Sequence, residues 1–389
     1  MLERIVINNF KSFSRRTIID FAKTNYTILP QNCTSDGILK GAMFVGANAS
    51  GKSNAILAIK ILLDLLFIER DINSGIFKCI FNTNPKYSLE YRFRIDGCEL
   101  DYSFEVDTRK NIISEKLILD GIVLLDRLGT AARVYITDSS GTMYNENDVD
   151  SEILFLRTLY FNTRFAGNSV LKDWMDFLSG SVYINAFEKR IVSYGKQDLN
   201  VIHYLRKNGS DTINQFFNEY NFKQTIEYSH ESVGKSVKIT IAGDEDEKNI
   251  FFKRKEINEP IPFSIESTGN QNLLRMLPAF LSVVSGSGML LIDEFSSGFH
   301  NELESLLIKY FMEKSVRSQL LFVSHSTNLL SNALLRPDQE YSVEFNGNMG
   351  TSLKRISSEQ PRAAQNIEKM YVSGVFGGLP GYEKVEDEG

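Results

Sequence analysis

Apolar residues form three short runs that lack alternation, at residues 42–45, 289–292 and 320–323. Continuous apolar runs of this length are typical of parallel strands that are covered on both faces. Residues 55–68 are also mainly apolar and predict a buried helix. Because ligands of open α/β sheets lie beyond the carboxyl ends of the strands, we expect the residues that follow the three runs to meet at one edge.

Elsewhere apolar and polar residues alternate, which is the pattern of half-buried antiparallel strands. Residues 89–95 and 100–106 alternate on either side of Asp96-Gly97, and this predicts a β-hairpin with a type I′ turn. Residues 145–228 are polar and rich in aromatic side chains, and they predict helices. A second hairpin is expected to pair 237–241 with 250–252 around an acidic turn at 244–247.

The first apolar run leads directly into Gly46-Ala-Asn-Ala-Ser-Gly51-Lys52-Ser53, which is a complete P-loop. Such a loop needs glycine because its backbone curls so that successive N–H groups point at phosphate oxygens. Lys52 would bridge the β and γ phosphates of ATP, and Ser53 would hold Mg²⁺. The competing interpretation is a glycine-rich turn before a helix, and the flanking strand and helix argue against it.

The other two apolar runs lead into polar residues that could take part in catalysis. The first leads into Asp293-Glu294 and the second into Ser324-His325. Asp293-Glu294 looks like a Walker B motif, in which the first carboxylate orients Mg²⁺ and the second acts as general base for the attacking water. An apolar strand that simply ends in solvent has the same pattern, but a P-loop in the same chain favours the Walker B interpretation.

Four further segments follow the order of motifs in one family of ATPases. Asn9-Phe-Lys11-Ser-Phe13 resembles the opening element of these proteins, Ser267-Thr268-Gly269-Asn270-Gln271 resembles the ABC signature, Ser297-Gly-Phe-His300 stands where the D-loop follows Walker B, and His325 matches the switch histidine that senses the γ-phosphate. The chain therefore resembles the ABC-type ATPase heads of the SMC, RecF and OLD group. The resemblance implies an α/β fold, with an antiparallel β subdomain and a helical insertion added to an ABC-type P-loop head.

Three features depart from the pattern of transport ATPases. Asn270 replaces the second glycine of the signature, and His300 replaces the aspartate of the D-loop. No glutamine can be assigned to the Q-loop, since Gln197, Gln215 and Gln224 all lie in the predicted insertion. The first two departures resemble the OLD-like branch. Segments 38–54, 266–269 and 371–380 look like the RloA or AbiL type of AAA-annotated ATPase, to which the ATPase of the PARIS phage-defence system is related.

The resemblance implies a set of site residues and a division of the chain. Catalytic roles are expected for Glu294, His325 and Lys52, Mg²⁺ binding for Ser53 and Asp293, and ATP binding for Gly46, Asn48, Ser50, Gly51, Lys52, Ser53, Asn54, Lys11, Ser267, Thr268, Gly269, Gln271, Ser297 and His300. The expected segments are the first part of the head (1–70), a β-hairpin subdomain (71–140), a mostly helical insertion ending in a hairpin (141–257), the second part of the head (258–360) and a C-terminal tail (361–389).

Composition limits the classes of binding partner that we expect. The chain has 389 residues with 43 basic and 49 acidic side chains, so its net charge of -6 excludes a generally basic nucleic-acid coat. DNA could still contact local basic runs at 15–16, 189–190 and 253–255, which are also typical of solvated surface. Three cysteines at irregular spacing, no signal peptide and no apolar run of membrane-spanning length predict a cytoplasmic protein with no membrane partner.

Candidate nuclease residues are few. His203, His230 and the pair Asp148/Asp150 lie outside any recognisable metal-binding spacing, and the segment after His325 is too short for another catalytic domain. We therefore expect an ATPase that pairs with a second copy through sandwiched ATP, as a homodimer or higher oligomer, and controls a separate nuclease or toxin effector in anti-phage defence. The alternative is a DNA-repair or chromosome-maintenance ATPase of RecF or SMC type that clamps DNA. The insertion and the 371–380 segment could dock the effector, or that segment could pack onto the head.

Overall fold

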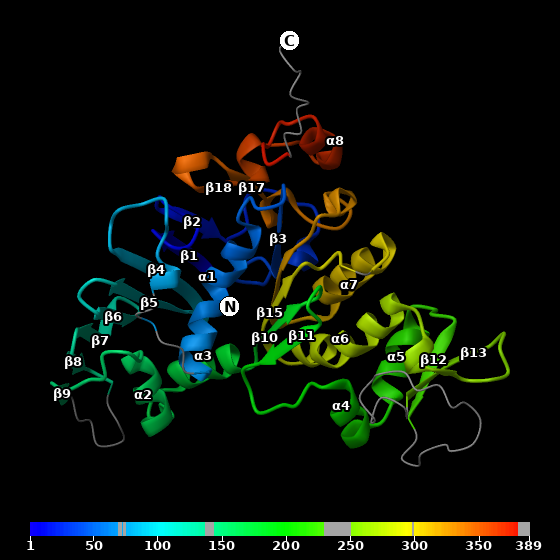
Figure 1. Cartoon of the computed structure of the whole chain (residues 1–389), viewed down its shortest axis with the longest axis horizontal. Helices are drawn as coiled ribbons and strands as arrows, with labels where there is room; N and C mark the ends of the chain where they lie inside the picture. The colour runs from blue at the N-terminus through cyan, green and yellow to red at the C-terminus, as the bar shows by residue number, and fades with distance from the viewer. Residues whose placement is uncertain (69–71, 73–74, 137–143, 229–249, 298, 380–389) are drawn as a thin grey trace, which may run out of the picture.

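The computed structural model describes residues 1–68, 72, 75–136, 144–228, 250–297 and 299–379. Its centre is a seven-stranded sheet in the order β11-β10-β15-β16-β3-β17-β18 (Figure 1). The five inner strands pair in parallel and the two edge strands pair antiparallel. In chain order the strands are β3 (Gly41–Gly46), β10 (Val182–Asn185), β11 (Arg190–Ser193), β15 (Ser287–Asp293), β16 (Arg317–Val323), β17 (Glu340–Phe345) and β18 (Thr351–Arg355).

The parallel strands confirm the interpretation of the continuous apolar runs. Every residue of β3 is buried, as are all but the first residue of β15 and of β16. Both faces of the sheet are covered, so the residues of these strands are apolar on both faces and do not alternate with polar ones. The neighbours β15, β16 and β3 bring Asp293, Ser324 and Gly46 to the same edge.

A second, antiparallel sheet of eight strands has the order β2-β1-β4-β5-β6-β7-β8-β9. The predicted hairpin is confirmed, because its two strands join through Asp96 and Gly97 with φ angles of 48° and 84°, the positive values that a type I′ turn requires. The strands are β1 (Leu2–Asn8), β2 (Thr17–Asp20), β4 (Lys86–Ile95), β5 (Cys98–Asp107), β6 (Ile112–Leu119), β7 (Ile122–Leu128), β8 (Ala131–Val134) and β9 (Tyr144–Glu146).

Helices fill the space on both sides of the parallel sheet. The helix predicted from residues 55–68 is α1 (Lys52–Phe67), and it lies with α3 (Ser169–Ser179) in the core between the two sheets. The opposite face of the parallel sheet packs against α6 (Thr268–Ser285) and α7 (Asn301–Lys314) in a second core (Figure 1). The remaining α-helices are α2 (Phe155–Thr163), α4 (Val201–Asn208), α5 (Asp211–Glu219) and α8 (Ile367–Val372).

Short elements complete the described chain. The 3-10 helices are η1 (Pro30–Asn32), η2 (Gly75–Phe77), η4 (Phe263–Ile265), η5 (Thr327–Leu329), η6 (Pro337–Gln339), η7 (Gly347–Met349) and η8 (Ile356–Glu359). None of the described helices combines the length and the apolar character that crossing a membrane requires.

The segment expected to be a helical insertion contributes to all three described sheets, since its first strand, β9, belongs to the antiparallel sheet. Its strands β10 and β11 extend the parallel sheet, with β10 pairing directly with β15. Its last strand, β13 (Ile250–Arg254), pairs with β12 (Gln224–Tyr228) and with β14 (Ile261–Pro262). The expected partner strand at 237–241 and the acidic turn at 244–247 lie outside the described residues. Pairing across a long sequence separation is invisible to local periodicity, so the sequence could not assign β10 to the head.

The antiparallel sheet encloses an ion pair whose removal tests this packing. Arg127 Nη1 lies 2.6 Å from Glu115 Oε1, both side chains are fully buried, and Glu115 also accepts from the Phe155 N–H. We expect Glu115→Gln to lower the free energy of unfolding by about 3 kcal/mol, because it leaves a buried guanidinium without its counter-charge. Urea unfolding followed by circular dichroism measures the change.

The exposed pair Lys86–Glu105 provides the matched control. Lys86→Ala is expected to change stability by less than about 1 kcal/mol, since solvent screens exposed pairs. Equal effects of the two substitutions would contradict the assignment of the buried pair as a structural centre.

Candidate functional site

The P-loop connects the end of β3 to the start of α1. Within it Ala49 and Gly51 have positive φ angles of 61° and 105°. A Cβ atom on Gly51 would lie 2.2 Å from Oγ1 of Thr351, so only glycine fits at this position. The backbone curls as a phosphate-binding loop requires, at the N-terminus of a sixteen-residue helix.

A chain of hydrogen bonds holds this loop from outside. The Thr351 hydroxyl lies 2.8 Å from the Ser50 carbonyl and 2.7 Å from the Ser12 hydroxyl, which in turn accepts from the Asn54 amide at 2.8 Å. A carbonyl can only accept, so Thr351 donates to Ser50 and accepts from Ser12. Asn54 and the opening Asn-Phe-Lys-Ser-Phe element therefore buttress the loop, and Thr351 is a participant that sequence patterns did not indicate.

Lys52 folds back over the P-loop. Its Nζ donates to the carbonyls of Gly46 and Ala47 at 3.0 and 2.7 Å. Burial lowers the pKa of Lys52, while the nearby carboxylates of Glu294 and Asp293 partly offset this by favouring the charged form. The Lys52 ammonium is thus hydrogen-bonded to two backbone carbonyls of the P-loop, and phosphate oxygens could replace them.

Asp293 meets the first turn of α1. The Ser53 hydroxyl donates to Asp293 Oδ1 at 3.0 Å, which joins the Walker A serine to the carboxylate at the end of β15. Burial raises the pKa of Asp293, since only 8% of the residue is exposed, and the Glu294 charge adds to the effect. A hydroxyl and a carboxylate oxygen in contact are a donor set that suits Mg²⁺, which binds to oxygen ligands and usually keeps phosphates and water as its others.

Glu294 and His325 face one another across the same edge. Nε2 of His325 lies 3.3 Å from Oε2 of Glu294, and both side chains are about one-third exposed. Glu294 has a positive φ of 57°, an unusual backbone conformation for this residue that is often found at functional sites. The Ser296 hydroxyl fixes His325 by accepting from its backbone N–H at 3.2 Å.

One open cavity of about 740 Å³ joins these groups, a size within the usual range for small-molecule sites. Its lining combines P-loop residues, the three catalytic candidates and an aromatic residue, namely Asn48, Ala49, Gly51, Lys52, Ser53, Asn54, Phe187, Glu294 and His325. Phe187 is 74% exposed and follows β10, whose last residue Asn185 is in register with Asp293. No pattern in the sequence indicated Phe187, because its place depends on the pairing of β10 with β15.

Gln197, Gln215 and Gln224 do not line this cavity. Gln197 Oε1 accepts instead from the Ser282 hydroxyl at 2.6 Å, and Gln224 pairs with Asn270.

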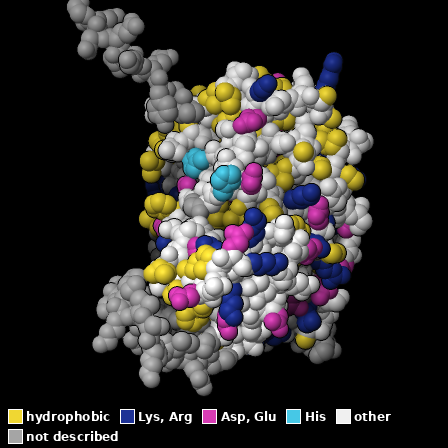
Figure 2. Space-filling view, turned by 90° about the vertical axis from the view of Figure 1, so that its right-hand side faces the viewer, with side chains coloured by type: hydrophobic (Ala, Val, Ile, Leu, Met, Phe, Trp, Pro, Cys, Tyr) yellow, Lys and Arg dark blue, Asp and Glu magenta, His cyan; other side chains and the backbone are white. Residues whose placement is uncertain are grey.

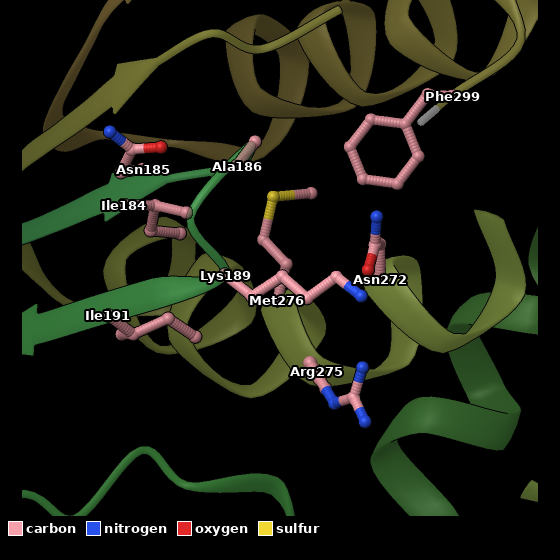
Figure 3. Close-up of a pocket in the computed structure, with 9 residues that line it drawn as sticks. All are labelled: Ile184, Asn185, Ala186, Lys189, Ile191, Asn272, Arg275, Met276 and Phe299. Atoms are coloured by element: carbon pink, nitrogen blue, oxygen red, sulfur yellow. The ribbon is translucent and has the colours of Figure 1, made fainter. Parts of the chain in front are cut away.

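The loop 186–189 follows the end of β10, next to Asp293. The opposite side of this loop lines a separate small cavity against α6, where Lys189 lies with Asn272, Met276 and Phe299 (Figure 3).

The signature residues lie apart from the cavity. Ser267 caps α6 by accepting from the Asn270 N–H at 3.3 Å, while Thr268 and Gly269 form the start of the helix. The Gln271 amide is bound to the carbonyls of Phe263 and Glu266 at 3.0 and 2.9 Å. None of the signature residues is among those that line the cavity, so one copy of the chain does not bring them to its own P-loop.

The remaining predicted residues have local partners. Ser297 donates its N–H to the Glu294 carbonyl at 2.9 Å, and His300 caps α7 by accepting from the Glu302 N–H at 3.3 Å. The Lys11 ammonium lies 5.4 Å from the centre of the Phe77 ring. Gly298 and His230 lie outside the described residues.

Glu304 is a further residue that the motifs did not identify. It is fully buried in α7, and its carboxyl accepts from the hydroxyls of Ser324 and Ser326 at 3.5 and 3.3 Å. Burial raises its pKa. Glu304 therefore links the helix after the D-loop to both neighbours of His325.

Comparisons with known proteins identify a family and a similar fold. Residues 42–331 match the family described as "AAA domain, putative AbiEii toxin, Type IV TA system". The chain is similar to a solved SMC head bound to the C-winged helix domain of ScpA, with 14% identity, a TM-score of 0.50 and coverage of 92% of this chain and 99% of that one. It is also similar to the SMC head domain from Thermotoga maritima, with 16% identity, a TM-score of 0.48 and coverage of 91% and 98%. No curated protein matches the sequence.

The Thermotoga maritima head is too distant to support any inference. The SMC head bound to the ScpA domain bears on the fold alone. This head agrees with the expected α/β fold, in which a parallel sheet and an antiparallel β subdomain enclose the P-loop helix. The RloA, AbiL and PARIS relationships remain predictions.

The buried Asp293 carboxyl supports a prediction about stability. Its native pKa is raised above the model-compound value of 3.8, so ionisation at neutral pH destabilises the folded state. We expect Asp293→Asn to raise the melting temperature of the nucleotide-free protein at pH 7, because the amide keeps the Ser53 contact without a buried charge. The gain should shrink as the pH falls through the raised native pKa, because the wild-type carboxyl then also becomes neutral. Calorimetry across this range measures both effects, and a lower melting temperature at pH 7 would contradict the assignment.

Proposed function

The chain belongs to the AAA-domain family described as putative AbiEii toxin, Type IV TA system, and on this premise we propose that it binds ATP and hydrolyses it with Mg²⁺. The observation that carries the proposal is the convergence at one cavity of the P-loop, the Ser53–Asp293 contact and the Glu294–His325 pair. These groups supply phosphate binding, metal binding and a general base, which are the three requirements of phosphoryl transfer to water.

Each residue has a definite part in this reaction. Lys52 exchanges its contacts with the Gly46 and Ala47 carbonyls for phosphate oxygens, while the curled backbone offers its N–H groups. Ser53 and Asp293 would hold Mg²⁺, which neutralises the charge that develops on the phosphates. Glu294 accepts a proton from the attacking water, and His325, 3.3 Å away, would orient that carboxylate and sense the γ-phosphate.

We further propose that the signature acts on the nucleotide of a second copy. Ser267, Thr268 and Gly269 lie at the start of α6, outside the cavity of their own chain. A helix N-terminus with unpaired N–H groups attracts the γ-phosphate, so ATP would join two heads and hydrolysis would release them. Asn270 and His300 fit this arrangement as structural residues, since the Asn270 side chain contacts Gln224 and Glu266 and His300 caps α7.

The proposed biological role is a nucleotide-gated switch that controls a separate effector protein in anti-phage defence. The family description, with its reference to AbiEii and to toxin–antitoxin systems, supports this role. The solved SMC head with a bound winged-helix domain is an example of a head of this fold that holds a second protein. Copurification with the product of the adjacent gene tests the effector part of the proposal.

The structure gives little support to the alternative of a DNA clamp. In two of the basic runs that could contact DNA, one arginine has a carboxylate partner within the chain, since Arg254 lies 2.6 Å from Glu266 and Arg190 lies 3.7 Å from Glu188. On the face in Figure 2, Lys and Arg side chains are interspersed with Asp and Glu side chains. Mixed charge of this kind provides a weaker electrostatic attraction for a phosphate backbone than a continuous basic stripe.

Glu294→Gln tests the general base. The substitution keeps the size of the side chain but removes its basicity, so we expect ATP to bind while turnover falls about 100-fold or more. Lys52→Ala should instead weaken ATP binding. Equilibrium binding of a fluorescent ATP analogue and phosphate release measure the two effects, and normal turnover of Glu294→Gln would refute the assignment.

Gly269→Asp tests the action of the signature in a second copy. The new carboxylate would face the γ-phosphate of the partner's nucleotide, and like charges repel strongly in a desolvated site. We expect normal ATP binding by each chain, no ATP-dependent pairing and no hydrolysis. Light scattering with ATP in the Glu294→Gln background measures pairing, and association equal to that of the parent would contradict the proposal.

A further inference from the structure

The C-terminal segment packs against the beginning of the P-loop. The Gly378 carbonyl accepts from the Ala47 backbone N–H at 2.8 Å, and the buried Tyr371 hydroxyl donates to the same carbonyl at 3.0 Å. The Ser342 hydroxyl of β17 donates to the preceding carbonyl, that of Gly377, at 3.0 Å. A segment near the end of the chain thus contacts the loop that follows β3.

The sequence of this segment fits the contact closely. Gly378 is buried and has a positive φ of 76°, and a Cβ atom there would lie 2.4 Å from Ser342 Oγ and 3.1 Å from the Val343 carbonyl. Glycine is therefore required by both conformation and space. Phe376 is buried in the same core as α6 and α7, and it anchors the segment. These features hold the Gly378 carbonyl at one position relative to the P-loop.

Ala47 is held on its other side by the P-loop itself. Its carbonyl accepts from Lys52 Nζ at 2.7 Å and from the Ser50 N–H at 3.3 Å. The peptide groups on both sides of Ala47 are consequently fixed, one by the C-terminal segment and one by the lysine that serves the phosphates. The orientation of these peptides determines how the chain leaves β3 and where the following N–H groups point.

We propose that residues 376–378, together with the Tyr371 hydroxyl, are a positioning element of the nucleotide site, which holds Ala47 so that the P-loop is preorganised for phosphate. The inference rests on the proposed binding of ATP and deepens it. Since Lys52 leaves the Ala47 carbonyl to reach phosphate, the Gly378 contact becomes the main support of that residue in the bound state. Binding of ATP and docking of the segment must then strengthen one another by the same factor.

Nucleotide affinity tests this element. In the Glu294→Gln background, Gly378→Ala is expected to weaken ATP binding about tenfold, the order of effect expected when one hydrogen bond to a buried group is lost. Tyr371→Phe removes one hydroxyl without a clash and should weaken binding about threefold. Tyr371→Phe therefore still tests the proposal if Gly378→Ala fails to fold.

Gly374→Ala is the matched control. Gly374 also has a positive φ, of 86°, but its nearest neighbour for an added Cβ is the end of the Leu379 side chain at 3.9 Å. Gly374→Ala carries a similar backbone penalty but does not displace the Gly378 carbonyl, so the ATP affinity of this variant should stay within about twofold of the parent.

Hydrogen exchange supplies the reciprocal measurement. Amides of residues 371–379 should exchange more slowly with Mg²⁺ and ATP in the parent protein and show no such protection in Gly378→Ala. If the parent binds ATP and a folded Gly378→Ala and Tyr371→Phe both bind it equally well, the positioning role is wrong while the ATPase proposal stands. If the parent itself fails to bind ATP, the proposed function is wrong and this inference falls with it.

Discussion

Parallel pairing of β15, β16 and β3 is the constraint on which the site depends. It places the ends of three buried strands at one edge, so that Asp293 reaches Ser53 and Glu294 reaches His325. β3 and the segments 289–292 of β15 and 320–323 of β16 are apolar and buried, and the polar site residues follow them directly. A charged residue within these apolar segments would lack a partner, whereas Asp293 at the strand end meets the first turn of α1.

The helix that follows the P-loop is fixed by polar contacts inside the core. Lys60 Nζ lies 2.6 Å from Asp64 Oδ2 and 4.8 Å from the centre of the Tyr183 ring, and the Tyr194 hydroxyl donates to Asp64 Oδ1 at 2.7 Å. Tyr183 and Tyr194 belong to or directly follow β10 and β11. Buried networks of this kind specify one packing arrangement, because any shift of β10 and β11 would remove the Tyr194 hydroxyl from Asp64 and the Tyr183 ring from Lys60. The position of the 186–189 loop beside the cavity is tied to α1 in this way.

Supports of the P-loop come from parts of the chain that are remote in sequence. Ser12 follows the first strand, Thr351 begins the last one, and Gly378 lies near the C-terminus. Thr351 and Gly378 form hydrogen bonds to the loop backbone, which any residue type offers, so no pattern of side chains indicates these contacts. Ser12 acts through the Thr351 hydroxyl and the Asn54 amide. The loop therefore depends on the closure of the whole head, although its own sequence is short and self-contained.

The sequence by itself determined the chemistry and the local structure. Continuous apolar runs predicted the buried strands, the Asp96-Gly97 pair predicted its hairpin, and the P-loop with Asp293, Glu294 and His325 predicted one edge of the sheet as the site. These features are local, because strand burial, turn conformation and phosphate-loop curvature are set within a few residues. Only the tertiary structure decided that β10 belongs to the central sheet, that Phe187 lines the cavity and that Glu304, Thr351 and Gly378 support its loops. These contacts join residues far apart along the chain, and their geometry exists only once both cores are packed.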